Sequence, residues 1–138
     1  MKAIRKEVGK PAEVIDLDMT YEFQRATVGG YIQMVPIGPG VEVVCNEEGM
    51  FAGPGGTPLP QNAAGYLGNI LIVAVDPDEG ECIDMTPEQL RKGLAYLERY
   101  AELKHDLSGG VGIIVGKANV DAFLLGKATH EQSIWDTL

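Results

Sequence analysis

Runs of apolar and β-branched residues, separated by glycine, proline and asparagine, dominate the first 84 positions of the chain. Such runs with polar turns between them predict a sheet. The segment 69–75 is apolar on both faces and is expected at the centre of that sheet. Pro36 directs its strand toward an edge or a bulge, because proline cannot donate to the ladder. The predicted strands are 2–8, 13–17, 31–37, 41–45, 69–75 and 81–84.

Two threonines mark the starts of helices. Thr20 can cap a short helix over 21–28. Thr86 forms a capping box with Gln89 before a long helix over 87–107. Apolar residues recur at helical spacing along the long helix, so this stripe is predicted to pack on the sheet. The stripe consists of Leu90, Leu94, Leu97 and Ala101.

The last thirty residues carry further elements. A strand is predicted over 111–115, and Asn119 and Thr129 can each cap a short helix. Trp135 and Leu138 are large apolar residues near the end of the sequence. We expect them to dock on the domain or on a second subunit, because large apolar side chains gain free energy when buried.

These patterns together predict the fold class. We expect a single α+β domain over residues 1–138, with a mostly antiparallel sheet and one long helix packed on a face. Residues 1–107 form its core, and residues 108–138 add a strand and a C-terminal helical extension.

Composition and charge narrow the class of protein. A chain of 138 residues, 45% of them hydrophobic, can bury one core. Its longest apolar run, 70–75, is too short to cross a bilayer, and residues 1–10 lack the apolar stretch of a signal peptide. We therefore expect a cytoplasmic protein. The net charge of −9 disfavours free nucleic acid as a target, because phosphate binding needs clustered lysine and arginine.

The glycines and serines of the chain form no familiar catalytic motif. The glycine-rich segment 53–56 lacks the lysine of a P-loop, and 109–112 precedes a strand where a dinucleotide fingerprint needs a helix. Ser108 and Ser133 lie outside any Gly-x-Ser-x-Gly motif. We expect a non-enzymatic protein without a cofactor.

Metal-ligand spacing is absent from the sequence. Cys45 and Cys82 have no Cys-x-x-Cys neighbour, and His105 and His130 are isolated. We expect two buried free thiols and no disulfide, because the cytosol keeps thiols reduced.

Polar groups suited to binding gather around the long loop 53–66. Amide and phenol groups can orient a polar ligand, and arginine forks suit phosphates. In the alternative interpretation the asparagines only stabilise turns. The candidate ligand-binding residues are Arg25, Asn46, Asn62, Tyr66, Arg91 and Arg99.

A run of acids without a base follows the segment 69–75. A solvated turn that leads into a helix explains it most simply, and a calcium loop fits poorly because the EF-hand spacing is missing. A third interpretation is an acidic face that meets a basic partner. The candidate partner-binding residues are Asp76, Asp78, Glu79, Glu81 and Asp84.

Four segments carry a resemblance: 31–36 (YIQMVP), 43–49 (VVCNEEG), 59–62 (LPQN) and 68–73 (GNILIV). Together they resemble domain-of-unknown-function family 3846, found in phages and mobile elements of Firmicutes. The resemblance covers about residues 1–107. Where the family often has arginine after the asparagine, this chain has Ala63, so an anion-binding role through that loop is not carried over.

The resemblance implies a mobile-element accessory protein. By analogy with small phage proteins that blunt host defence, we expect capture of a small nucleotide-type immune signal by a homo-oligomer in the host cytoplasm. The loop 53–66 would form the lid or wall of the pocket, and a subunit interface would complete it. The alternative is an acidic protein-binding inhibitor of a host restriction or CRISPR protein. Neither function involves free nucleic acid or a membrane.

Overall fold

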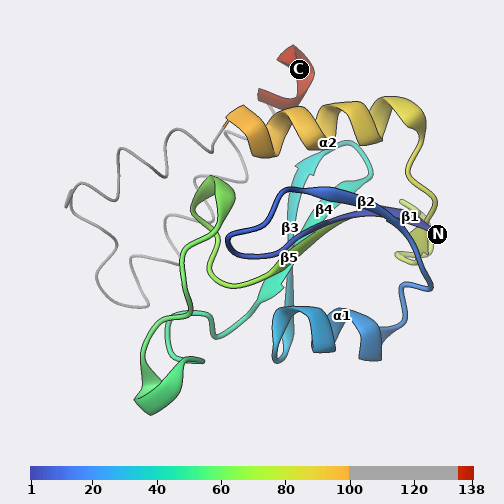
Figure 1. Cartoon of the computed structure of the whole chain (residues 1–138). Coiled ribbons are helices and arrows are strands. Elements are labelled where there is room, and N and C mark those ends of the chain that lie inside the picture. Colours follow the sequence, from blue (N-terminus) through green and yellow to red (C-terminus); the bar gives the residue numbers. More distant parts are fainter. Residues whose placement is uncertain (100–133) are drawn as a thin grey trace.

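The computed structural model describes residues 1–99 and 134–138 (Figure 1). The helices are α1 (Tyr21–Val28) and α2 (Pro87–Arg99), and two 3₁₀ turns are η1 (Pro54–Gly56) and η2 (Ala63–Gly65). The strands are β1 (Lys2–Lys6), β2 (Glu13–Asp16), β3 (Ile32–Gly38), β4 (Val41–Asn46), β5 (Ile70–Val75) and β6 (Cys82–Ile83). Every strand predicted from residues 1–84 is present.

The strands form one antiparallel sheet in the order β2-β1-β5-β4-β3, and β6 pairs with the end of β5. The prediction that β5 is central is confirmed, since β1 and β4 flank it. The prediction for Pro36 is also confirmed. It lies on the edge strand β3, where the register shifts between Pro36 and Gly38.

The sheet has two covered faces, with α2 on one and α1 on the other (Figure 1). Alternate residues of β5 supply both cores. Ile72 packs in the core beneath α2, and Leu71 packs in the core beneath α1. Gly93 lets α2 approach closely, because a Cβ there would lie 2.6 Å from the Cδ1 atom of Ile4. The long helix on one face was predicted, whereas cover of the second face by α1 was not.

Side-chain caps fix the starts of both helices as predicted. The Thr20 hydroxyl accepts a hydrogen bond from the Phe23 amide at 3.1 Å. Thr86 and Gln89 exchange bonds of 2.9 and 3.1 Å in a capping box. Gly29 ends α1 with φ at 81°, a left-handed conformation that glycine adopts without strain.

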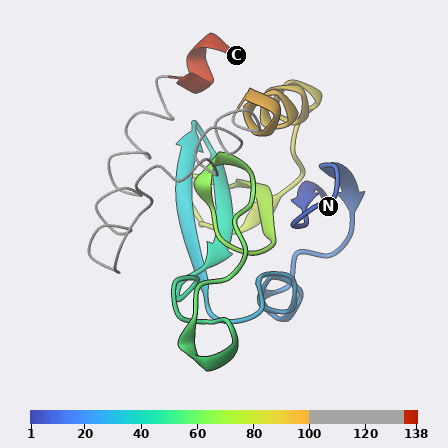
Figure 2. The same cartoon turned by 60° about the vertical axis from the view of Figure 1, so that its left-hand side comes forward.

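A C-terminal turn over 134–137 packs beside α2 (Figures 1 and 2). Trp135 is only 4% exposed, and a Cβ on Gly38 would lie 2.5 Å from its ring. Lys92 of α2 donates to the Trp135 carbonyl at 3.2 Å. Trp135 therefore docks on the domain itself, which is one of the two outcomes expected from the sequence.

Several predictions lie outside the described residues. They are the continuation of the long helix over 100–107, the strand 111–115, and the helices expected after Asn119 and Thr129. None of the helices within 1–99 and 134–138 is both long and apolar enough to cross a membrane.

Candidate functional site

Asn62 is completely buried and holds the long loop to the sheet. Its amide nitrogen donates to the carbonyls of Lys6 and Gly68, each at 2.9 Å. Its amide oxygen accepts from the backbone N–H of Ala63 at 2.8 Å. The hydrogen bonds of this side chain are thus made within the chain, as in the alternative interpretation in which asparagine stabilises a turn.

Tyr66 follows in the same half of the loop and is 2% exposed. Its hydroxyl lies 3.2 Å from the hydroxyl of Tyr96 on α2. Ala64, between these anchors, has φ at 60°, which the fixed turn around it maintains. The second half of the 53–66 loop is therefore part of the core. Its first half, around η1, is largely exposed.

The arginines lie on different elements. Arg91 is exposed near the start of α2, where it pairs with Glu88 at 2.6 Å and donates to the Leu138 carbonyl at 3.0 Å. Arg99 is the last described residue of α2, and its side chain lies outside the described part of the structure. Arg25 lies on α1, across the sheet from both. The structure thus does not bring the six predicted ligand-binding residues together.

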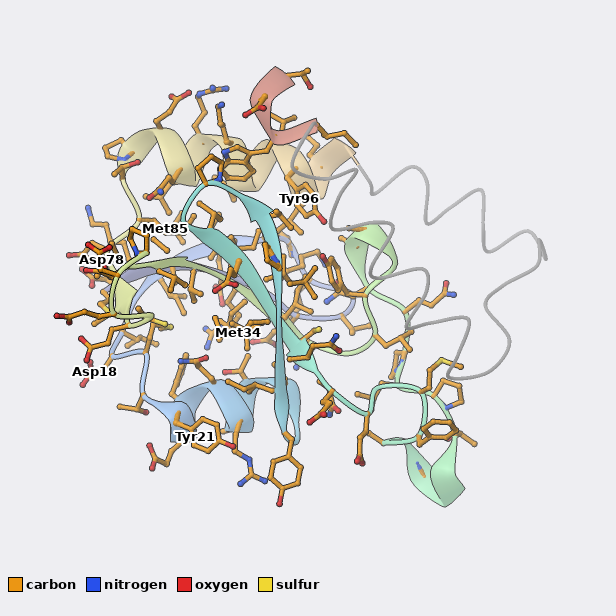
Figure 3. All side chains as sticks on the ribbon, turned by 180° about the vertical axis from the view of Figure 1, so that it is seen from behind. Asp18, Tyr21, Met34, Asp78, Met85 and Tyr96 are labelled. Carbon is orange, nitrogen blue, oxygen red and sulfur yellow. The ribbon has the colours of Figure 1, made fainter. Side chains whose placement is uncertain are left out.

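Arg25 makes a surface cluster with two tyrosines, which we call the tyrosine–arginine site (Tyr21, Arg25 and Tyr31). Its guanidinium carbon lies 4.4 Å from the centre of the Tyr31 ring and 5.8 Å from that of Tyr21. Tyr21 is 50% exposed and Tyr31 is 57% exposed. Figure 3 shows Tyr21 at α1, on the opposite side of the sheet from Tyr96.

The Arg25 guanidinium lacks an acidic partner among the residues that the structure describes. Its Nε atom is buried and has no hydrogen-bond partner, whereas Arg5 and Arg91 both pair with carboxylates. A buried donor without a partner is uncommon, because leaving it unpaired costs about 1–3 kcal/mol. The tyrosine–arginine site is therefore a cationic group next to two aromatic rings, without a carboxylate partner in the described part of the chain.

Asn46 forms hydrogen bonds to the segments next to this site. Its side chain donates to the Val28 carbonyl at the end of α1 and accepts from the Glu48 amide, at 3.1 and 2.8 Å. The Tyr31 carbonyl accepts from the Glu47 amide at 2.8 Å. Asn46 thus joins the end of α1 to the turn after β4. Of the other predicted ligand-binding residues, Asn46 is hydrogen-bonded to the helix that carries Arg25, through the Val28 carbonyl.

Sequence reasoning missed both tyrosines of the site. Tyr21 and Arg25 are four residues apart on a helix, a spacing that places two side chains side by side. That signal was present in the sequence. Tyr31 lies between the Gly29–Gly30 end of α1 and the start of β3, and its ring meets Arg25 only once the chain has folded.

The acidic residues of the alternative lie around the turn between β5 and β6. Asp76 shapes that turn by accepting from the amides of Asp78 and Glu79, at 2.8 and 3.2 Å. Asp84 accepts from the Lys2 amide at 2.7 Å. We call this surface the acidic edge; its members are Asp16, Asp18, Asp76, Asp78, Glu79, Glu81 and Asp84.

Five carboxylates of the acidic edge have no ion pair with any cation in the described ranges: Asp18, Asp76, and the group of three that follows Asp76, namely Asp78, Glu79 and Glu81. All members of this group of three are exposed. Figure 3 shows Asp18 and Asp78 on the same side of the molecule. The run of acids therefore forms a solvated surface, which Asp16 at the end of β2 and Asp18 just after it join.

The two cysteines are free thiols in the described structure. Burial raises the pKa of Cys45 to about 12, so its reactive thiolate is scarce at neutral pH. Burial also raises the pKa of Cys82, which is only partly buried, whereas two buried free thiols were expected. Within 1–99 and 134–138, no three His, Cys, Asp or Glu side chains group as metal ligands.

Comparison with known proteins gives one result. A family model described as Domain of unknown function (DUF3846) matches residues 1–101. The match carries no enzymatic assignment. No curated protein and no solved structure matches the chain.

Proposed function

The chain belongs to the DUF3846 family, and from this premise we propose that it is a non-enzymatic counter-defence protein of a phage or mobile element. In this proposal it binds and sequesters a small nucleotide-type signal. The tyrosine–arginine site is the binding surface. No covalent chemistry is needed, because retention of the signal is itself the activity.

The main support is Arg25, which lacks a carboxylate partner among the described residues of a chain with net charge −9. A guanidinium binds phosphate oxygens through paired N–H donors. The neighbouring Tyr21 and Tyr31 rings can stack on a base, which is a sequence-tolerant interaction worth about 1–3 kcal/mol per base. One anionic group and one flat ring are the parts that a nucleotide combines.

A second copy of the chain completes the site in this proposal. Both tyrosines are at least 50% exposed, so one side of a bound base would remain in water. Cover of that side would exclude water and strengthen the phosphate contact. The expected homo-oligomer can be measured by light scattering with and without the nucleotide.

The first test is a thermal-shift screen with linear and cyclic nucleotides of adenine and guanine. Ligand at a hundredfold excess over Kd stabilises the native state by about 2.7 kcal/mol, which moves the melting temperature by several degrees. Arg25→Gln is expected to weaken binding at least about tenfold, because it removes a charge-assisted hydrogen bond.

Arg91→Gln is the matched control, since it makes the same charge change on an exposed arginine that is paired with Glu88. This variant is expected to bind as the native protein does. Tyr31→Leu keeps an apolar side chain but removes the ring, and should weaken binding as well. Equal affinity of the Arg25→Gln and Arg91→Gln variants would reject the site.

A second candidate function is inhibition of a host defence protein through the acidic edge. Its support is the set of three exposed carboxylates without ion pairs, Asp78, Glu79 and Glu81, on a turn that Asp76 shapes. Like charges held together attract a basic surface and speed its association. This attraction weakens with added salt, because charges are screened within about 8–10 Å near physiological ionic strength.

Charge reversal tests this second candidate. The triple variant Asp78→Lys, Glu79→Lys, Glu81→Lys is expected to bind a lysine-rich peptide at least about tenfold more weakly, with a smaller salt dependence. The control reverses three exposed acids elsewhere, Glu47, Glu48 and Glu98, with the same change in net charge. Equal losses in both triple variants would indicate net charge alone and exclude a specific acidic surface.

A further inference from the structure

Strand β2 ends the sheet, and its outer side has no strand beside it among the described residues. The outer side of an edge strand offers unpaired N–H and C=O groups to another chain. Val14 and Leu17 at this edge are 49% and 45% exposed. The edge therefore combines free backbone groups with exposed apolar side chains.

The register shows which backbone groups point outward. Leu17 donates its N–H to the Met1 carbonyl at 3.1 Å, so the backbone N–H and C=O groups of Leu17 face β1. In an antiparallel strand the N–H and C=O groups of one residue share a side, and this side alternates along the strand. Val14 and Asp16 therefore direct their backbone groups away from β1 and can pair with an added strand.

The two edges of the sheet differ in how they are protected. Edge strand β3 contains Pro36 and a shift in register, both of which disturb further pairing. Strand β2 has neither feature. The two acids of β2 both form ion pairs: Glu13 lies 2.6 Å from Arg5, and Asp16 lies 2.9 Å from the Met1 amino group. The bond to that amino group lowers the pKa of Asp16 and keeps the carboxylate charged.

The negative charge near β2 favours a basic partner strand over a second copy of β2. The acidic edge begins at the end of β2 with Asp16 and Asp18 and continues through Asp84. Pairing of two β2 strands would place the acidic edges of two copies side by side, which like-charge repulsion at that edge opposes. A basic strand instead gains both backbone hydrogen bonds and charge attraction.

We infer that β2 accepts an extended basic segment of a partner protein as an added strand. This inference rests on the second candidate function, and gives it a binding geometry. The added strand pairs with the outward groups of Val14 and Asp16, and its lysine or arginine side chains reach the acidic edge.

The test uses a synthetic ten-residue peptide of alternating lysine and valine. A second peptide of the same sequence carries N-methyl groups at alternate residues, which block its pairing with one strand while leaving its charge unchanged. The unmodified peptide is expected to slow hydrogen exchange at the Val14 and Asp16 amides at least about tenfold, because both become hydrogen-bonded in the complex. The methylated peptide is expected to give no such protection.

Val14→Pro removes one outward N–H and leaves the hydrogen bonds to β1 in place. This variant is expected to bind the unmodified peptide about threefold to tenfold more weakly. Val14→Thr keeps the N–H and is the matched control, with affinity expected near that of the native protein.

The outcomes separate strand addition from charge attraction. Binding that is equal for both peptides, and unchanged in Val14→Pro but lost on charge reversal at the acidic edge, would overturn strand addition and leave the second candidate function standing. Absence of any binding by the unmodified peptide would overturn both.

Discussion

Replacement of Trp135 by alanine is expected to lower the free energy of unfolding by about 3–5 kcal/mol, because a large buried ring is lost and a cavity remains. The ring is 4% exposed and lies against Gly38 of the edge strand β3. Lys92 holds the turn in place through the Trp135 carbonyl. The expected result is a clear shift of the chemical denaturation midpoint, followed by circular dichroism.

Two further variants make this prediction specific. Asp136→Ala changes the neighbouring exposed residue and should leave stability within about 0.5 kcal/mol. Gly38→Ala alters the other partner of this contact. It should also destabilise the protein, because the new Cβ would lie 2.5 Å from the Trp135 ring. If Trp135→Ala unfolds at the same denaturant concentration as Asp136→Ala, the C-terminal turn does not dock as described.

The second large effect is expected at Asn62. Alanine at this position removes three hydrogen bonds from a fully buried site, to Lys6, Ala63 and Gly68. The substitution leaves buried backbone groups without hydrogen-bond partners, which adds to the destabilisation. We therefore expect a loss of about 2–4 kcal/mol in the free energy of unfolding. The change can be measured by urea denaturation at equilibrium.

Gln61→Ala is the control for Asn62, since the neighbouring side chain is partly exposed. It should change stability little. The Asn62→Ala variant should also retain nucleotide affinity at temperatures where it is folded, because Asn62 lies apart from the tyrosine–arginine site. A stable Asn62→Ala variant that has lost nucleotide binding would instead return Asn62 to the role of a ligand-binding residue.

Much of the fold was predictable because its signals are local. The apolar run of β5 and the threonine caps each act within a few residues, so the chain shows them directly. The packing of α1 on the second face of the sheet was harder to predict from the sequence. It depends on side chains such as Leu71 and Ala3, which alternate toward α1 only once the strand register is fixed.

The candidate site was less predictable, for a physical reason. Asn62 and Tyr66 have the chemistry of ligand-binding residues, and sequence alone does not show that backbone carbonyls or Tyr96 occupy their polar atoms. Tyr31 meets Arg25 only through the fold, because different elements carry them. Arg25 was identified from its residue type, whereas its lack of an acidic partner required the positions of the described carboxylates.

The most direct test of ligand capture follows the Nε–H group of Arg25 by nuclear magnetic resonance. We would titrate isotopically labelled protein with the nucleotide that gives the largest thermal shift, and assign the signal with Arg25→Gln. The Arg25 signal is expected to move and to saturate with the same Kd as the whole protein. An unchanged Arg25 signal, while binding is detected elsewhere in the protein, would contradict this expectation.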